Sequence, residues 1–116
     1  MADYFDTDDK KYVRDYRQHS ADLLASYVAF SGAVFADDEA RAIPKKYREL
    51  MALAVSVSKQ CPYCIETHST AAVKAGANEA ELAEAAWVAS AIGAGAAYTH
   101  GRLGFKLSGI HDHPAE

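Results

Sequence analysis

Apolar side chains recur three and four residues apart in the longer stretches of this chain, and no stretch alternates apolar and polar residues as a β-strand does. This spacing predicts an all-α protein. A chain of 116 residues with 50% hydrophobic side chains can bury one core but is too short for two ordinary domains. We therefore expect a single-domain helical bundle over residues 1–116. The expected helices span residues 8–18, 20–35, 44–59, 62–75 and 79–99.

The first apolar stretch is predicted to form two helices, or one helix bent at Ser20, a residue type that caps helices. Its apolar residues fall on one stripe of a helix, and we expect this stripe to pack in the core rather than to form an aromatic cofactor site. The stripe consists of Tyr12, Tyr16, Leu23, Tyr27, Phe30 and Val34.

The last expected helix is rich in alanine and glycine. Asn78 followed by Glu81 has the spacing of a capping box and predicts a helix start at residue 79. Alanine and glycine supply too little transfer free energy for a membrane span, so we expect a buried central helix or a helix between subunits. Three glycines from Gly101 onward predict a helix end near Thr99, then one short turn and a mobile tail.

The formal net charge is −4, from 16 acidic and 12 basic side chains, and no run is rich in lysine or arginine. The chain therefore lacks the positive patch typical of nucleic-acid-binding proteins. Residues 1–11 are polar and acidic and do not have the pattern of a secretory signal, so we expect a cytoplasmic protein. In that reducing compartment a close cysteine pair is more often catalytic or metal-binding than structural.

The two cysteines of the chain form a Cys-x-x-Cys motif, Cys61 to Cys64, with His68 four residues further on. Pro62 suits the first position of a helix, so Cys61 is predicted to be the N-cap and Cys64 the third helical residue. Free backbone N–H groups and the positive end of the helix dipole favour the thiolate there. His68 falls on the same helix face as Cys64, and a base beside a thiol is the minimal activated nucleophile.

Five interpretations of such a cysteine pair compete. A c-type haem site requires histidine directly after the second cysteine, and Ile65 occupies that position, so haem attachment is excluded. A structural zinc site could use both cysteines and His68, with His100 or the His111/His113 tail as the fourth ligand. A thioredoxin domain requires a β-sheet, which this sequence does not predict. An inert buried pair and a redox-active pair both remain open at this point.

Glu49 lies on the expected helix 44–59, next to the apolar residue Leu50. Composition favours a solvated glutamate at such a position, because charged side chains are rarely buried. Its place beside the apolar stripe also allows a carboxylate that faces the interior.

These residues together form the pattern Glu49-x11-Cys61-x2-Cys64-x3-His68 on two successive helices. The pattern resembles the core motif of the alkylhydroperoxidase D-like branch of the carboxymuconolactone decarboxylase family, and the resemblance extends over about residues 43–100. Tyr63 stands where the best-studied alkylhydroperoxidase D type has a histidine. The decarboxylase branch lacks the cysteine pair, which argues against lactone decarboxylation.

The resemblance implies an all-helical fold, assembly as a homotrimer or homohexamer, and no cofactor or metal. It also implies roles for the four residues. Cys64 would attack the peroxide and Cys61 would resolve the product to a disulfide. His68 would act with Glu49 in a proton relay that activates the thiol.

The expected function is therefore that of a thiol-dependent peroxidase or dithiol–disulfide oxidoreductase that reduces hydroperoxides in antioxidant defence. A dithiol or a lipoyl-bearing protein is the expected reductant, and neither nucleic acid nor a membrane is an expected partner. The alternative is a non-enzymatic redox sensor or assembly module that uses the same cysteine pair as a switch.

Overall fold

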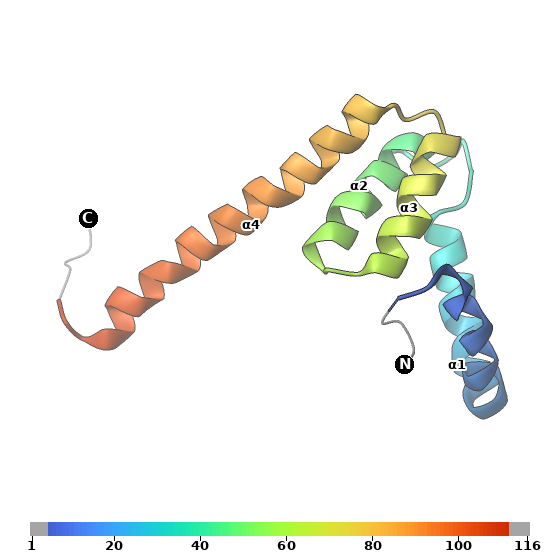
Figure 1. The fold of residues 1–116 in the computed structure, drawn as a ribbon, viewed down its shortest axis with the longest axis horizontal. Coiled ribbons are helices and arrows are strands. Elements are labelled where there is room, and N and C mark those ends of the chain that lie inside the picture. The colour runs from blue at the N-terminus through green and yellow to red at the C-terminus, as the bar shows by residue number, and fades with distance from the viewer. Residues whose placement is uncertain (1–4, 112–116) are drawn as a thin grey trace.

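A computed structural model of the chain describes residues 5–111, which form helices joined by short loops and contain no strand (Figure 1). The all-α prediction is confirmed. A 3-10 helix, η1 (Thr7–Tyr12), leads into α1 (Val13–Val34). The other helices are α2 (Lys45–Ser58), α3 (Pro62–Lys74) and α4 (Glu79–Ser108).

The core lies where α2, α3 and the first half of α4 pack together. The helices α2 and α3 form an antiparallel hairpin, whose turn passes through Gln60 in the left-handed region at φ 54°. Four apolar side chains are buried in the described part of the chain, Leu53, Ala72, Ala77 and Ala89, together with the polar Glu49 and Ser56. Three of the four buried apolar residues are alanines, whose small side chains permit close packing.

The sequence signals for helix starts agree with the structure for α3 and α4 but differ by one residue for α2. Cys61 is the N-cap of α3 with Pro62 at the first helical position. Asn78 caps α4 through a capping box with Glu81. Pro44, expected at the first helical position, is instead the N-cap, so α2 begins at Lys45, one residue later than predicted.

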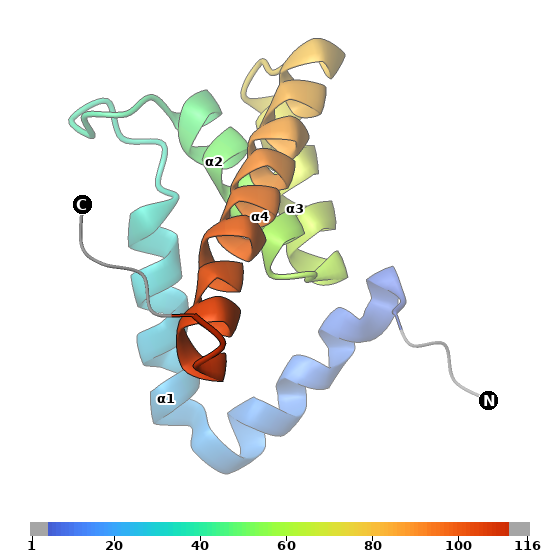
Figure 2. The ribbon, with the colours of Figure 1, turned by 90° about the vertical axis from the view of Figure 1, so that its left-hand side faces the viewer.

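Helix α1 bends sharply at Ser20, whose φ of −155° and ψ of 54° are not helical (Figure 2). This is the bent helix that the sequence allowed as one of two alternatives. Because of the bend, η1 and the part of α1 before Ser20 run back toward α3. There Thr7 donates a hydrogen bond to Glu66 over 2.8 Å, and Tyr63 donates one to Asp9 over 2.8 Å.

The prediction that the α1 stripe packs in the core is wrong for the single chain. No residue of α1 is buried, and Tyr16 and Phe30 each keep 68% of their surface exposed. The reason is geometric, because α1 reaches the α2–α3 hairpin mainly through its C-terminal end. There the Arg48 guanidinium donates to the backbone carbonyls of Val34 and Ala36, over 2.7 and 2.8 Å.

The predicted helix end near Thr99 is also wrong, because α4 continues through Gly101 and Gly104 to Ser108. A glycine inside a helix costs only about 1 kcal/mol, which does not break a helix of this length. The helix ends at Gly109, which adopts the left-handed conformation at φ 69° that favours glycine. Most of the predicted mobile tail, from residue 112 onward, lies outside the described residues.

The second half of α4 runs away from the core, so the molecule is elongated (Figure 1). Its radius of gyration is 19.4 Å, against about 13 Å for a compact domain of this length. None of the helices within residues 5–111 is long and apolar enough to cross a membrane.

Candidate active site

The α2–α3 hairpin places Glu49 of α2 against His68 of α3. The Glu49 Oε2 atom lies 2.6 Å from His68 Nδ1, and only 1% of the Glu49 surface is exposed. Of the two orientations that the sequence left open, the structure therefore has the inward one. The carboxylate oxygen accepts the Nδ1–H, and in the neutral imidazole this tautomer leaves Nε2 as a hydrogen-bond acceptor.

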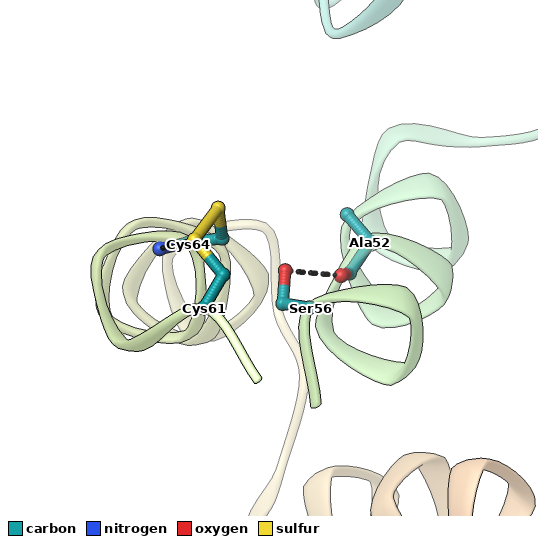
Figure 3. The surroundings of a disulfide bond; sticks show 4 residues. All are labelled: Ala52, Ser56, Cys61 and Cys64. Carbon is teal, nitrogen blue, oxygen red and sulfur yellow. Dashed lines mark hydrogen bonds between the residues drawn. A yellow bond between two sulfur atoms is a disulfide. The ribbon is translucent and has the colours of Figure 1, made fainter. Parts of the chain in front are cut away.

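The cysteine pair occupies the N-terminus of α3 and is joined by a disulfide (Figure 3). Cys61 caps the helix, because its Sγ accepts the backbone N–H of Cys64 over 3.2 Å. Ser56 of α2 faces the pair, with its hydroxyl donating to the Ala52 carbonyl 2.6 Å away (Figure 3). The site therefore holds its cysteines in the oxidised state in this structure.

Cys64 and His68 line the same two cavities. One cavity, of about 390 Å³, has an apolar wall that includes Val34, Met51 and Val55. The other, of about 440 Å³, is also lined by Glu49, Lys45 and Tyr63. Each cavity is large enough for a small organic molecule, and Cys64 and His68 both line its wall.

Lys45 supplies the second partner of Glu49. Its Nζ lies 2.7 Å from Glu49 Oε1 and also donates a short hydrogen bond to the Phe35 carbonyl at the end of α1. The Phe35 ring in turn packs on the His68 ring, with 4.5 Å between their centroids. One ammonium group thus connects the end of α1 with the Glu49–His68 pair.

The charge state of Glu49 follows from these contacts. Burial raises the pKa of the Glu49 carboxyl, but the hydrogen bonds from Lys45 and His68, together with their charges, outweigh this effect. The pKa of Glu49 is therefore held below its ordinary value of 4.5. At neutral pH the buried group is a carboxylate.

Tyr63, between the two cysteines, points to the N-terminal segment. Its ring packs edge-on against Phe5, with 4.7 Å between centroids, and its hydroxyl bonds to Asp9. A histidine at this position could act as a base near the sulfurs. Tyr63 instead contacts Phe5 and Asp9 and so holds the N-terminal segment close to the cysteine pair.

The zinc interpretation gains no support from the geometry. Within residues 5–111, no group of three or more His, Cys, Asp or Glu side chains is arranged to hold a metal ion. His100 lies on the exposed distal half of α4, where it contacts the Ala96 carbonyl. His113 lies outside the described residues.

Two residues of this site, Lys45 and Phe35, are not among those predicted from the sequence. Lys45 stands four residues before Glu49, a spacing that brings side chains together on a helix, so this signal was present in the sequence. No local pattern predicts that Phe35 reaches His68, because the two residues are joined only through the packing of α1 on the hairpin.

Fold and site together define an all-helical protein with a redox-capable cysteine pair at a helix N-terminus, beside a buried carboxylate–imidazole pair. The chain belongs to the carboxymuconolactone decarboxylase family, whose pattern matches residues 21–105. Members of this family are enzymes of decarboxylase or peroxidase-like type.

Two relatives illustrate the similarity. An uncharacterised protein of the cox locus of Paracoccus denitrificans is 44% identical over 80 residues, which are 69% of each chain. The crystal structure of an apo carboxymuconolactone decarboxylase family protein from Legionella pneumophila superposes with a TM-score of 0.64 at 33% identity. That match covers 73% of each chain.

Proposed function

We propose that this protein is a thiol-dependent peroxidase of the alkylhydroperoxidase D-like branch, which reduces hydroperoxides through Cys64 and Cys61. The observation that carries the proposal is that Cys64 and His68 line the same cavities, with the Glu49 carboxylate buried behind the imidazole. The site therefore holds a nucleophile, a base and the group that orients the base.

In the first step, Cys64 in its reduced form loses its proton to Nε2 of His68. The thiolate attacks one oxygen of the hydroperoxide, so an S–O bond forms and the O–O bond breaks. The sulfur is oxidised to a sulfenic acid, and the peroxide is reduced to an alcohol. His68 returns its proton to the leaving alkoxide, as a general base that becomes a general acid.

In the second step, the Cys61 thiol attacks the sulfenic sulfur of Cys64. An S–S bond forms and water leaves, which prevents further oxidation of the sulfur. The product is the disulfide that the structure contains between the two residues. An external dithiol, such as a lipoyl group, then restores both thiols by thiol–disulfide exchange.

Single-cysteine variants test this division of labour. Cys61→Ser should form one sulfenic acid per chain and then stall, because no thiol remains to resolve it. Cys64→Ser should not react with peroxide, and Ser58→Ala, an exposed serine before the same turn, should behave as the wild type. Mass spectrometry after a peroxide pulse measures these products, and the opposite behaviour of the two cysteine variants would reverse the assignment.

Turnover separates the enzyme from the redox-sensor alternative. The proposal predicts sustained hydroperoxide consumption when a reducing dithiol is supplied in excess, with lipoyl dithiol among the donors tested. A single oxidation per chain that changes the oligomeric state, without continued consumption, would instead support a sensor or assembly module.

We further propose that the chain assembles as a homotrimer or homohexamer. Large apolar side chains of α1 and α4 are exposed in the single chain, among them Tyr16, Phe30, Ile92 and Phe105. Soluble monomers rarely expose apolar surface on this scale. A second copy supplies an equally apolar surface, and helical faces of this kind are commonly paired by symmetry.

A further inference from the structure

Both oxygens of the buried Glu49 carboxylate have a partner, one a lysine ammonium and the other a histidine ring. Oε1 accepts from the Lys45 ammonium over 2.7 Å, and Oε2 lies 2.6 Å from His68 Nδ1. Lysine carries its positive charge throughout the physiological pH range, whereas an imidazole can be neutral or charged. The carboxylate is thus compensated whether or not His68 holds a second proton.

The position of Lys45 is fixed from a third direction. Its ammonium also donates to the Phe35 carbonyl, and it lies 5.8 Å from the centroid of the Phe35 ring. Only about a quarter of its side chain is exposed, against nearly none for Glu49. A lysine held by two acceptors at a buried carboxylate is more constrained than a surface ion pair, and its charge is less screened by water.

The charge of Lys45 has a consequence for His68. If the lysine were neutral or absent, His68 would be the only group left to compensate the Glu49 carboxylate. The negative charge of the carboxylate would then stabilise the doubly protonated, positively charged form of the His68 imidazole. A doubly protonated imidazole has no acceptor atom and cannot take the proton of Cys64. A nearby fixed cation opposes that second protonation.

We propose that Lys45 is a positioning residue of this site, which keeps Glu49 a carboxylate and leaves His68 neutral, with Nε2 free to accept the thiol proton. The proposal rests on the peroxidase function above for its catalytic meaning. Its effect on the charge of His68 is independent of that function.

Other charged groups near His68 do not replace Lys45. The ionisable residues that line the two cavities with His68 are Tyr27 of α1, Lys45, Arg48, Glu49 and Lys59 of α2, and Tyr63 and Cys64 of α3. Arg48 donates to backbone carbonyls, and Lys59 is exposed at the end of α2. Within the described part of the chain, the ion pairs of Glu49 are those with Lys45 and His68.

The direct test is an NMR titration of the histidine rings in the full-length reduced protein, with the His68 signal assigned by its loss in His68→Asn. Lys45→Met should move the titration midpoint of His68 to higher pH by about one unit, the scale of a nearby unit charge. Lys45→Gln keeps a hydrogen-bond donor but no charge, and it should shift the midpoint equally. If Lys45→Met does not fold, Lys45→Gln alone provides the test.

Two variants act as controls. Lys45→Arg retains the charge and should leave the midpoint within about 0.3 units of the wild type. Lys46→Met removes the adjacent lysine, which pairs with Glu81 at 2.9 Å, and should leave the midpoint unchanged. A Lys45→Met or Lys45→Gln midpoint equal to that of Lys46→Met would overturn the proposal.

The activity profile separates this proposal from the proposed function. In a working peroxidase, the acid limb of the turnover profile should move with the His68 midpoint in Lys45→Met and Lys45→Gln. A shifted midpoint in a protein without peroxide turnover would support the role of Lys45 and reject the peroxidase. Turnover that is lowered equally at every pH, with an unmoved midpoint, would reduce Lys45 to a purely structural residue.

Discussion

Glu49 has the largest fully buried side chain among the described residues. A buried carboxylate costs several kcal/mol unless it is paired, and here two donors from two helices offset that cost. The same contacts that make the charge tolerable also orient His68. In the proposed mechanism Glu49 serves both stability and chemistry, so its substitution is expected to affect both.

The stability of the fold should therefore depend on pH through Glu49. Because the pKa of Glu49 is lowered in the folded state, its stabilisation is complete above the ordinary value of 4.5 and is lost as the pH falls through the lowered pKa. Glu49→Gln should lower the free energy of unfolding by about 1–3 kcal/mol at neutral pH. The difference in free energy of unfolding between Glu49→Gln and the wild type should narrow as the pH falls below 4.5.

Urea denaturation between neutral and acidic pH, at one protein concentration, measures this gap. Glu39→Gln, at an exposed glutamate in the loop before α2, is the matched control and should show no comparable gap. A gap for Glu49→Gln that stays constant down to low pH would mean that the carboxylate charge does not stabilise the fold.

At the scale of the elements, the start of α4 is fastened to α2. The Asn78 side chain accepts from the Glu81 backbone over 2.8 Å, and Glu81 pairs with Lys46 of α2 at 2.9 Å. Two hydrogen bonds to the Glu81 carboxylate lower its pKa and keep it charged. The larger effect comes from the Asn78 backbone N–H and the smaller one from the Lys46 side chain. The cap therefore starts α4, and the Glu81–Lys46 ion pair joins this start to α2.

Asn78→Ala should remove this cap and lower the free energy of unfolding by about 1 kcal/mol, because the N–H groups of the first turn lose their acceptor. Asn78→Asp keeps a capping oxygen and should stay within a few tenths of a kcal/mol of the wild type. Chemical denaturation monitored by circular dichroism measures both. Equal losses in the two variants would show that the cap is not what stabilises this end of α4.

At the scale of the whole molecule, the single chain buries its polar site better than its apolar side chains. The α2–α3 hairpin covers Glu49 completely, whereas Trp87, the one tryptophan of the chain, is 72% exposed. Such a distribution is typical of a subunit whose remaining apolar surface is covered by other copies.

Trp87 offers a test of the proposed assembly. If the chain forms a trimer or hexamer through α4, Trp87 should emit at shorter wavelength in the assembly and shift to longer wavelength when the protein is diluted until it dissociates. Light scattering should give three or six times the chain mass of 12.5 kDa. A monodisperse monomer at micromolar concentration, with the emission of an exposed tryptophan, would contradict the proposed assembly.

The sequence by itself determined the features that depend on neighbours along the chain. Cys61 as an N-cap, the capping box at Asn78 and the bend at Ser20 each follow from a few adjacent residues, because hydrogen bonds at helix ends are local. The spacing from Glu49 to His68 was also sufficient to place the two residues on successive helices. These predictions needed no knowledge of how the helices pack.

Only the tertiary structure decided what each helix face meets. It turned Glu49 inward, joined Lys45 and Phe35 to His68, and left the apolar stripe of α1 exposed in the single chain. It also carried α4 past Gly101, where local glycine signals had predicted an end. The physical reason is that a helix face has the same sequence pattern whether it meets the chain's own core, another surface or water.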